Sequence, residues 1–253
     1  IRVAGDEGID AHIAKGGTIS LARTPAQLAR ARSEVAEARS WGRDEDDLAL
    51  LDKPAADAVL RASGTLGATY TPDCAAIHPA RLVTGLAREV ERRGVVIHEG
   101  TQVRSITPHR VETEYGMVSA DVVVRATEGY TPLLAGQERA IAPVHSLIVA
   151  TAPLATETWD EIGLHRRETF TDHRHLLVYG QRTADDRLVF GGRGAPYRLG
   201  SRITTDFTRD RAVFRHLREA LVDLFPSLHD VTITHSWGGT LGIARDWCAS
   251  AGL

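Results

Sequence analysis

The stretch Ala120-Asp121-Val122-Val123-Val124-Arg125-Ala126-Thr127-Glu128-Gly129 decides the fold class. Its consecutive valines predict a buried strand, and this strand leads directly into a turn that contains threonine and glycine. Nucleotide-binding sheets present their backbone to a ligand at such turns, because small residues let phosphates approach the main chain. A bound cofactor is therefore the first hypothesis that the sequence suggests.

The segments before this stretch predict alternating helices and strands. Residues 79–94 have apolar side chains at helical spacing, whereas residues 95–98 and 101–106 are short apolar runs typical of strands. A small three-stranded excursion is expected over residues 103–119. The order of helix, strand, small β excursion and buried strand favours an α/β fold in this part of the chain.

The remaining segments predict an antiparallel sheet packed with helices. Thr24-Pro25 marks a helix start, because threonine caps a helix and proline suits its first turn. Strands are expected at residues 18–22, 146–150, 176–179, 188–191 and 231–237. Helices are expected at residues 25–41, after Lys53-Pro54, and at residues 209–224.

The composition excludes several functional classes. The 253 residues carry 30 Lys and Arg against 33 Asp and Glu, a net charge of −3, so no nucleic-acid partner is expected. No apolar run approaches the ~20 residues that span a bilayer. The two cysteines, Cys74 and Cys248, are far apart and form no C-x-x-C motif, which favours a reducing cytoplasm.

The glycine motif that usually opens a dinucleotide-binding sheet is missing from the sequence. The nearest candidate to G-x-G-x-x-G, Gly192-Arg193-Gly194-Ala195-Pro196-Tyr197, has tyrosine in place of the third glycine. Either the pyrophosphate-binding part lies outside these residues or no dinucleotide binds. Because the chain starts at Ile1 without an initiator Met, we expect this first residue to mark a cut or an incomplete gene.

Two groups of motifs carry a family resemblance. The first group comprises Gly67-Ala68-Thr69-Tyr70-Thr71-Pro72-Asp73, His78-Pro79, Gly94, and residues 103–106 and 122–129. The second group comprises Tyr179-Gly180-Gln181-Arg182-Thr183, residues 191–197, His235-Ser236-Trp237-Gly238-Gly239 and Arg245-Asp246-Trp247. The first group resembles the D-amino-acid-oxidase-like FAD-dependent oxidoreductases, and the second resembles their γ-glutamylputrescine oxidase-like branch.

The resemblance implies FAD as the cofactor and an α/β (α+β) fold. In this fold, a partial FAD-binding Rossmann-like domain accompanies an antiparallel-sheet substrate domain. The family's N-terminal G-x-G-x-x-G unit and its C-terminal flavin element are not found in these residues, so the resemblance implies that the chain is an internal fragment of such a protein. The implied order is substrate domain at residues 1–78, FAD domain at 79–141, substrate domain at 142–235, and a return into the FAD domain at 236–253.

Three sets of cofactor contacts follow from the resemblance. They are Val103 for the adenine, then Ala126, Thr127 and Gly129 for the pyrophosphate and ribityl chain, and finally Trp237, Gly238 and Gly239 near the isoalloxazine ring. Glu128 separates Thr127 from Gly129, so the turn departs from a plain A-T-G. Trp237 has a second interpretation, because a tryptophan at a strand end is commonly a core residue.

The implied reaction moves a hydride from an amine-bearing carbon to flavin N5, after which water hydrolyses the imine and oxygen or another acceptor takes the electrons. Tyr179, Gly192 and Arg193 lie at predicted strand ends that would border the pocket for the amine or amino-acid substrate. Arg193 would bind a carboxylate bidentately, as a γ-glutamyl substrate requires. Alternatively, Gly191-Gly192 is a bulge and Arg193 is a surface ion-pair partner.

Histidines and cysteines offer further candidates for the chemistry. His145 precedes a predicted strand and is a candidate to accept a proton from the substrate amine, although such a histidine is more often packed and hydrogen-bonded. His173 and His175 lack a third ligand at metal spacing, so a polar loop is expected there. Cys248 does not match the family's pattern for covalent flavin attachment.

Two hypotheses other than a complete oxidoreductase remain open. One is a non-catalytic binding module that kept the substrate domain and lost the cofactor half. The other is an oxidoreductase subunit whose ADP-binding portion comes from a separate chain. A G-x-G-x-x-G motif upstream in the same gene would favour the oxidoreductase, and a co-purifying partner would favour the subunit.

Overall fold

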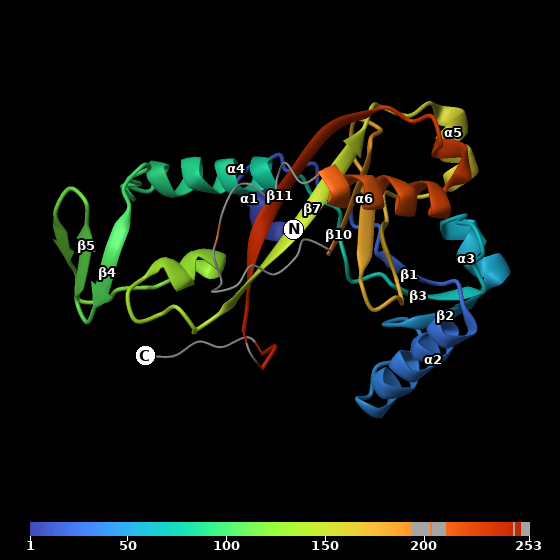
Figure 1. Ribbon diagram of the computed structural model, residues 1–253, viewed down its shortest axis with the longest axis horizontal. Coiled ribbons are helices and arrows are strands. Elements are labelled where there is room, and N and C mark those ends of the chain that lie inside the picture. Colours follow the sequence, from blue (N-terminus) through green and yellow to red (C-terminus); the bar gives the residue numbers. More distant parts are fainter. Residues whose placement is uncertain (194–202, 204–210, 245, 249–253) are drawn as a thin grey trace. The chain divides into compact units, whose positions relative to one another are not determined.

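The structure is a computed structural model that describes residues 1–193, 203, 211–244 and 246–248 (Figure 1). The chain divides into two compact units. The first unit comprises Ile1–Gly94, Leu147–Arg193 and Arg211–Trp237. The second comprises Val95–Ser146 and the described residues after Trp237. This division by contacts does not test whether residues 79–141 and 236–253 form a cofactor domain, so that assignment stays a prediction.

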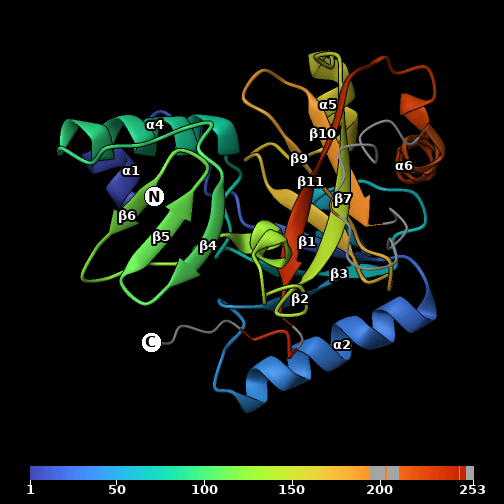
Figure 2. The ribbon, with the colours of Figure 1, turned by 60° about the vertical axis from the view of Figure 1, so that its left-hand side comes forward.

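An eight-stranded sheet forms the centre of the first unit, with the strand order β11-β7-β10-β9-β8-β1-β3-β2 (Figure 2). Its strands are β1 Thr18–Ala22, β2 Ala49–Asp52, β3 Gly67–Thr71, β7 Ala142–Thr151, β8 Thr169–Asp172, β9 Val178–Arg182, β10 Leu188–Arg193 and β11 Ile233–Ile243. β1 pairs with β8 in parallel, whereas β2–β3, β1–β3, β8–β9 and β9–β10 are antiparallel. β7 and β11 each continue into the second unit. The mixed α/β class predicted from the sequence is confirmed.

Local signals explain where the helices of the first unit begin and end. The helices are α1 Arg2–Asp6, α2 Pro25–Ser40, α3 Lys53–Val59, α4 Pro79–Arg92, α5 Thr156–Ile162 and α6 Arg211–Leu224, followed by the 3-10 helix η3 Pro226–Leu228. The Thr24 side chain caps α2 by accepting from the Gln27 N–H, as its sequence predicts. Gly42 and Gly94 follow α2 and α4 with φ of +78° and +90°, which explains why those helices end there. Among the described residues, no helix is both long and apolar enough to cross a membrane.

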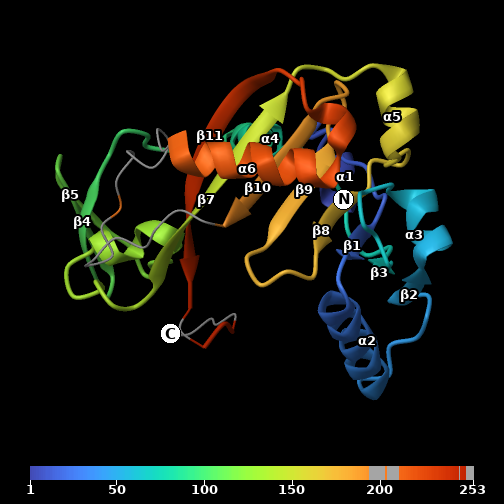
Figure 3. The same ribbon diagram turned by 45° about the vertical axis from the view of Figure 1, so that its right-hand side comes forward.

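The core of the first unit lies between the sheet and α6. α6 packs against β10 (Figure 3). It buries Val213, Leu217, Leu221 and Leu224. This confirms the predicted helix, apart from residues 209 and 210, which lie outside the described residues. The ring of Phe170 stacks on Phe190 and meets Phe225 edge-on, with ring centroids 6.2 and 5.7 Å away. These aromatic contacts join β8, β10 and the end of α6 into one apolar cluster.

The second unit contains a separate three-stranded sheet, as predicted for residues 103–119. Its strands are β4 Val103–Thr107, β5 Arg110–Thr113 and β6 Met117–Ser119, joined in the order β4-β5-β6 (Figure 2). A 3-10 helix, η1 Glu128–Leu133, follows the quoted alanine-to-glycine stretch. All pairings in this small sheet are antiparallel.

Three predicted elements differ in the structure. Residues 95–98 and 120–126 are irregular rather than strands, and Val122 and Val124 are 73% and 81% exposed. The reason is that a strand needs a neighbour for its backbone groups, and no described strand pairs with either segment. β11 continues to Ile243 instead of ending at Trp237, since Gly238 and Gly239 remain in the extended chain.

Candidate functional site

The turn Ala126–Gly129, here called the A-T-E-G turn, lies in the second unit. Hydrogen bonds of Thr127 and of the following Thr131 hold it. The Thr131 hydroxyl donates to the Glu128 carbonyl oxygen at 2.7 Å, and Thr127 Oγ1 lies 2.8 Å from Thr131 Oγ1. Because Thr131 has already used its one proton, Thr127 donates to Thr131. The lone pairs of the Thr127 hydroxyl therefore remain to accept a hydrogen bond, which suits a ligand hydroxyl better than a phosphate oxygen.

The same turn is in close contact with β11. Gly129 is buried, and a Cβ atom at this position would lie 2.8 Å from the Thr240 carbonyl oxygen. Only glycine permits so close an approach of two main chains. Glu128 Oε1 accepts a hydrogen bond from the Gly242 N–H at 2.7 Å, and Glu128 Oε2 accepts from the N–H of Gly129. Thr127 and Gly129 are thereby placed beside the C-terminal half of β11.

Val103 lies at an edge of the three-stranded sheet. It pairs with Thr113 of β5, and the register shifts between Val103 and Ser105. Since β4 is an outer strand in the order β4-β5-β6, its other side has no strand partner among the described residues. Backbone groups of an edge strand are free to meet a ligand. The predicted adenine contact at Val103 is compatible with this position and remains a prediction.

His145 is buried and links β7 to β11. Its side chain is 5% exposed, and Nδ1 lies 3.1 Å from Thr240 Oγ1. This contact matches the packed and hydrogen-bonded interpretation of this histidine. A role in proton transfer remains a hypothesis, and it would require the substrate to reach a ring that is almost covered.

The predicted isoalloxazine contacts lie in the middle of β11. Trp237 is 40% exposed, so this side chain is not a core residue in the structure. A Cβ atom added to Gly239 would meet no atom of the described residues within 4 Å. Within the described part of the chain, the strand is therefore open at Gly239, whereas the positions of Gly129 and Gly242 are tightly packed.

The predicted substrate residues belong to the first unit. Tyr179 of β9 pairs with Gly191 of β10 in regular register, and Val178 pairs with Gly192, so no bulge interrupts the pairing of β9 with β10. A Cβ atom at Gly191 would lie 2.6 Å from the Tyr179 ring, which explains this glycine by packing. A Cβ atom at Gly192 would lie 3.1 Å from Leu217 Cδ2 of α6. Arg193 ends β10, and its side chain lies outside the described residues.

The other histidine and cysteine candidates lie in ordinary environments. Burial lowers the pKa of His173, and its Nε2 lies 3.8 Å from a Glu34 carboxylate oxygen. His175 Nε2 is 3.4 Å from an Arg30 guanidinium nitrogen. Among the described residues, no group of three or more His, Cys, Asp or Glu is arranged to bind a metal ion. Cys248 is exposed, and its Sγ lies 3.4 Å from the Asp246 carbonyl oxygen.

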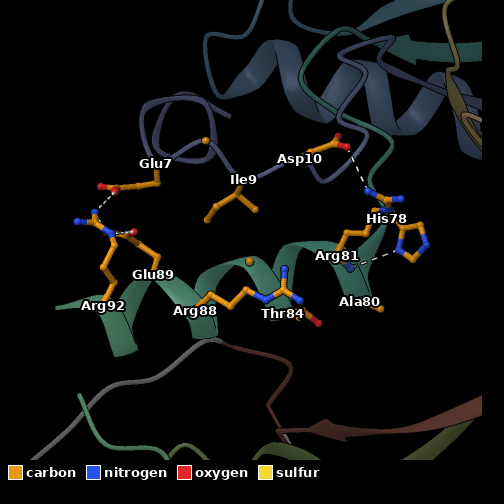
Figure 4. Close-up of a pocket in the computed structure, with 12 residues that line it drawn as sticks. Glu7, Ile9, Asp10, His78, Ala80, Arg81, Thr84, Arg88, Glu89 and Arg92 are labelled. Atoms are coloured by element: carbon orange, nitrogen blue, oxygen red, sulfur yellow. Dashed lines mark hydrogen bonds and ion pairs between the residues drawn. The ribbon is translucent and has the colours of Figure 1, made fainter. Parts of the chain in front are cut away.

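A cavity of about 660 Å³ lies in the first unit, between residues 7–10 and one side of α4 (Figure 4). Arg81 and Asp10 form an ion pair at 3.1 Å at one end, and Arg92 pairs with Glu89 at 2.6 Å at the other. Acidic and basic groups therefore neutralise each other along its walls. None of the site residues predicted from the sequence lines this cavity.

Sequence reasoning missed the residues that hold the A-T-E-G turn in place. Thr131 was detectable in principle, because Thr127 and Thr131 are four residues apart and share one side of a helical turn. Thr240 and Gly242 carried no local signal for their contacts. Their partners lie more than 90 residues away in the chain, so only the folded structure reveals them.

Comparison with known proteins gives relatives that are longer than this chain. The probable oxidoreductase OrdL of Rhizobium meliloti (strain 1021) is 36% identical over 175 residues, which are 66% of this chain and 37% of that protein. The gamma-glutamylputrescine oxidoreductase of Escherichia coli (strain K12) is 28% identical over 239 residues, which are 91% of this chain and 52% of that protein. The chain thus spans about half or less of these relatives.

Solved structures show the same fold. Glycine oxidase from Geobacillus kaustophilus aligns with a TM-score of 0.79 at 20% identity, over 98% of this chain and 65% of that chain. L-proline dehydrogenase from P. horikoshii aligns with a TM-score of 0.77 at 18% identity, over 97% of this chain and 64% of that chain. Residues 2–250 match the DAO family, described as FAD dependent oxidoreductase. The resemblance seen in the sequence is confirmed, and the chain belongs to the DAO family of FAD-dependent oxidoreductases.

Proposed function

We propose that the protein oxidises a C–N bond of an amine or amino acid, using FAD as the acceptor of the hydride. The observation that carries the proposal is the family match over residues 2–250, because it covers both compact units. When bound, FAD supplies the oxidising chemistry, and hydrolysis of the resulting imine completes the reaction. The protein has to hold the substrate and the cofactor in reacting positions and exclude competing water.

The residues of the second unit are chemically suited to FAD. The outer edge of β4 at Val103 has no strand partner among the described residues, and backbone N–H and C=O groups on such an edge match the donor and acceptor pattern of an adenine. The Thr127 hydroxyl is available as an acceptor for a ribityl hydroxyl. Ala126 and Gly129 add little side-chain bulk at the turn, and Gly238 and Gly239 carry no side chain that would keep a planar ring from the main chain of β11. We propose these residues, together with Trp237, as the cofactor contacts.

The first unit is the proposed substrate side. Tyr179, Gly192 and Arg193 lie on the paired strands β9 and β10, and an arginine there would bind a substrate carboxylate bidentately. The relatives include a gamma-glutamylputrescine oxidoreductase and a D-amino acid dehydrogenase, which supports an amine or amino-acid substrate for this chain. We propose a γ-glutamylated amine as the first substrate to test. His145 is the proposed, secondary candidate for proton transfer.

Two further features belong to the same proposal. The electrons taken from the substrate would pass from bound FAD to oxygen or another electron acceptor. The compartment is the reducing cytoplasm, a choice that the two cysteines support because Cys74 and Cys248 form no disulfide.

Flavin spectroscopy on the protein expressed from its natural reading frame tests the proposal. After incubation with FAD and removal of the unbound cofactor, we expect flavin absorption bands to remain with the protein. These bands should bleach under anaerobic conditions when γ-glutamylputrescine or an amino acid is added, and they should return when oxygen or a quinone is admitted.

The alternative of a non-catalytic binding module predicts a different spectrum. A protein that binds an amine in a calorimetric titration but retains no flavin would contradict the oxidoreductase and support the binding module. If flavin is retained only after a second chain is added, the separate-subunit hypothesis holds instead.

A further inference from the structure

Glu128 has an unusual backbone conformation for its residue type. Its φ angle is +43°, in the left-handed region that favours glycine, and Thr127 before it has φ −94° and ψ 0°. A right-handed residue followed by a left-handed one turns successive backbone N–H groups toward the same side. The shape of the A-T-E-G turn therefore depends on Glu128 keeping a conformation that its own side chain disfavours.

The Glu128 carboxylate makes contacts that oppose this intrinsic preference. Its Oε1 accepts the Gly242 N–H at 2.7 Å across 114 residues of sequence, and its Oε2 accepts the N–H of the adjacent Gly129. Hydrogen bonds from backbone N–H groups to a carboxylate are stronger than those between neutral groups. The Glu128 side chain thus binds both a backbone N–H of β11 and a backbone N–H of its own turn.

Packing on both sides makes this arrangement specific. A Cβ atom at Gly242 would lie 2.8 Å from the Glu128 carbonyl carbon, 2.9 Å from the Gly129 nitrogen and 2.9 Å from Ile141 Cγ2. At Gly129, a Cβ atom would lie 2.8 Å from the Thr240 carbonyl oxygen. The two main chains are already in contact, so a side chain at either glycine would separate the turn from β11.

We propose that Glu128 is a positioning residue for the flavin, whose carboxylate holds the Ala126–Gly129 turn against Gly242 in the conformation that receives the cofactor. This inference rests on the proposed function, because it assumes that the turn contacts FAD. The proposal assigns a role to Glu128, the residue that separates Thr127 from Gly129 and makes the turn differ from a plain A-T-G. The opposite hypothesis is that the carboxylate occupies the place of a cofactor phosphate and competes with FAD.

The affinity of the FAD-free protein for FAD separates these hypotheses, because they predict changes of opposite sign. In the protein from the natural reading frame, Glu128→Ala should raise the Kd for FAD about tenfold, since both acceptor oxygens are lost. Glu128→Gln retains one acceptor oxygen and should give a smaller increase. Quenching of FAD fluorescence on binding gives the Kd of each variant.

Glu138→Ala is the matched control. Glu138 lies in the same unit and its Oε1 also accepts a backbone N–H, from Gly136 at 3.0 Å, but this bond stays within one local turn. The Kd for FAD should be unchanged in this variant. Hydrogen exchange of the Gly242 amide in the FAD-free protein gives a second readout. It should become faster in Glu128→Ala and stay unchanged in Glu138→Ala.

Each outcome decides the proposal. An unchanged or tighter Kd in Glu128→Ala or in Glu128→Gln, with the far-UV circular dichroism of the parent protein, overturns it and leaves the proposed function intact. Unchanged exchange at Gly242 overturns it as well. If the parent protein binds no FAD, the proposed function fails and the positioning role falls with it. The exchange data then still report whether the contact exists.

Discussion

At the scale of single residues, the ion-pair cluster on α4 illustrates how charge is balanced on this protein. The Glu89 side chain is largely covered and contacts two arginines, with 2.6 Å between Glu89 Oε1 and nitrogens of Arg92 and Arg93. Arg93 also pairs with Glu7 at 2.5 Å, so the cluster joins α4 to the residue after α1. Hydrogen bonds from Arg92 and Arg93 lower the pKa of Glu89 from 4.5 to about 2.

This pKa predicts how stability depends on pH. The folded state lowers the pKa of Glu89, so the stabilising contribution is fully present above the ordinary pKa of 4.5 and is lost as the pH falls toward 2. We expect Glu89→Gln to be less stable than the parent at neutral pH, and this difference to shrink below pH 4.5. Urea unfolding at several pH values measures it.

The matched control for this prediction is Glu91→Gln. Glu91 lies on the same helix and is exposed, and no ion pair of its side chain is found among the described residues. Its free energy of unfolding should follow that of the parent at every pH. A difference between Glu89→Gln and the parent that stays constant from neutral pH to about pH 3 would contradict the assigned pKa.

At the scale of elements, Asp52 connects a strand to a helix. It is the last residue of β2 and the N-cap of α3, and its side chain accepts the Ala55 N–H at 2.9 Å. The first turn of a helix leaves N–H groups without partners inside the helix, and a capping carboxylate satisfies one of them. α3 is only seven residues long, so its start depends strongly on this single cap.

Removal of this cap should weaken the protein measurably. We expect Asp52→Ala to lower the free energy of unfolding by about 1 kcal/mol, because the Ala55 N–H loses its acceptor. Asp52→Asn should have nearly the stability of the parent, since asparagine caps helices about as well as aspartate. Chemical denaturation compares the three proteins. Equal losses in both variants would show that charge, rather than capping, is responsible.

At the scale of the whole molecule, two apolar segments of the second unit are exposed. Val95 and Val96 are 53% and 72% exposed in one segment, and Val122 and Val124 are 73% and 81% exposed in the other. Apolar runs of this kind usually mark surfaces that another element covers. The relatives are nearly twice as long as this chain, and we propose that a segment of the full protein covers these residues.

Hydrogen exchange on two forms of the protein tests this explanation. In the protein from the natural reading frame, we expect the amides of residues 95–97 and 122–124 to exchange slowly, because paired strands protect their N–H groups. In the 253-residue chain produced alone, the same amides should exchange rapidly. Amides of β9 serve as the internal control and should be protected in both forms. Rapid exchange of both segments in both forms would refute the covering segment.

The sequence alone determined the elements whose signals are local, together with the family. The cap at Thr24-Pro25, the glycines that follow α2 and α4, and the turn at Asp185-Asp186 act within a few residues, so the helices and hairpins they bound were predictable. The valine-rich segment before the A-T-E-G turn was predicted as a buried strand because its composition has that character. Composition cannot supply the neighbouring strand that a buried strand requires.

The tertiary structure alone decided which distant residues meet at the candidate site. Glu128 and Gly242 are 114 residues apart, and so no sequence spacing links them. The contact between Gly129 and Thr240 and the hydrogen bond between His145 and Thr240 arise only when β7 and β11 have brought their segments together. The physical reason is that helix caps and turns depend on nearby backbone geometry, whereas close approach of two main chains depends on how the whole sheet folds.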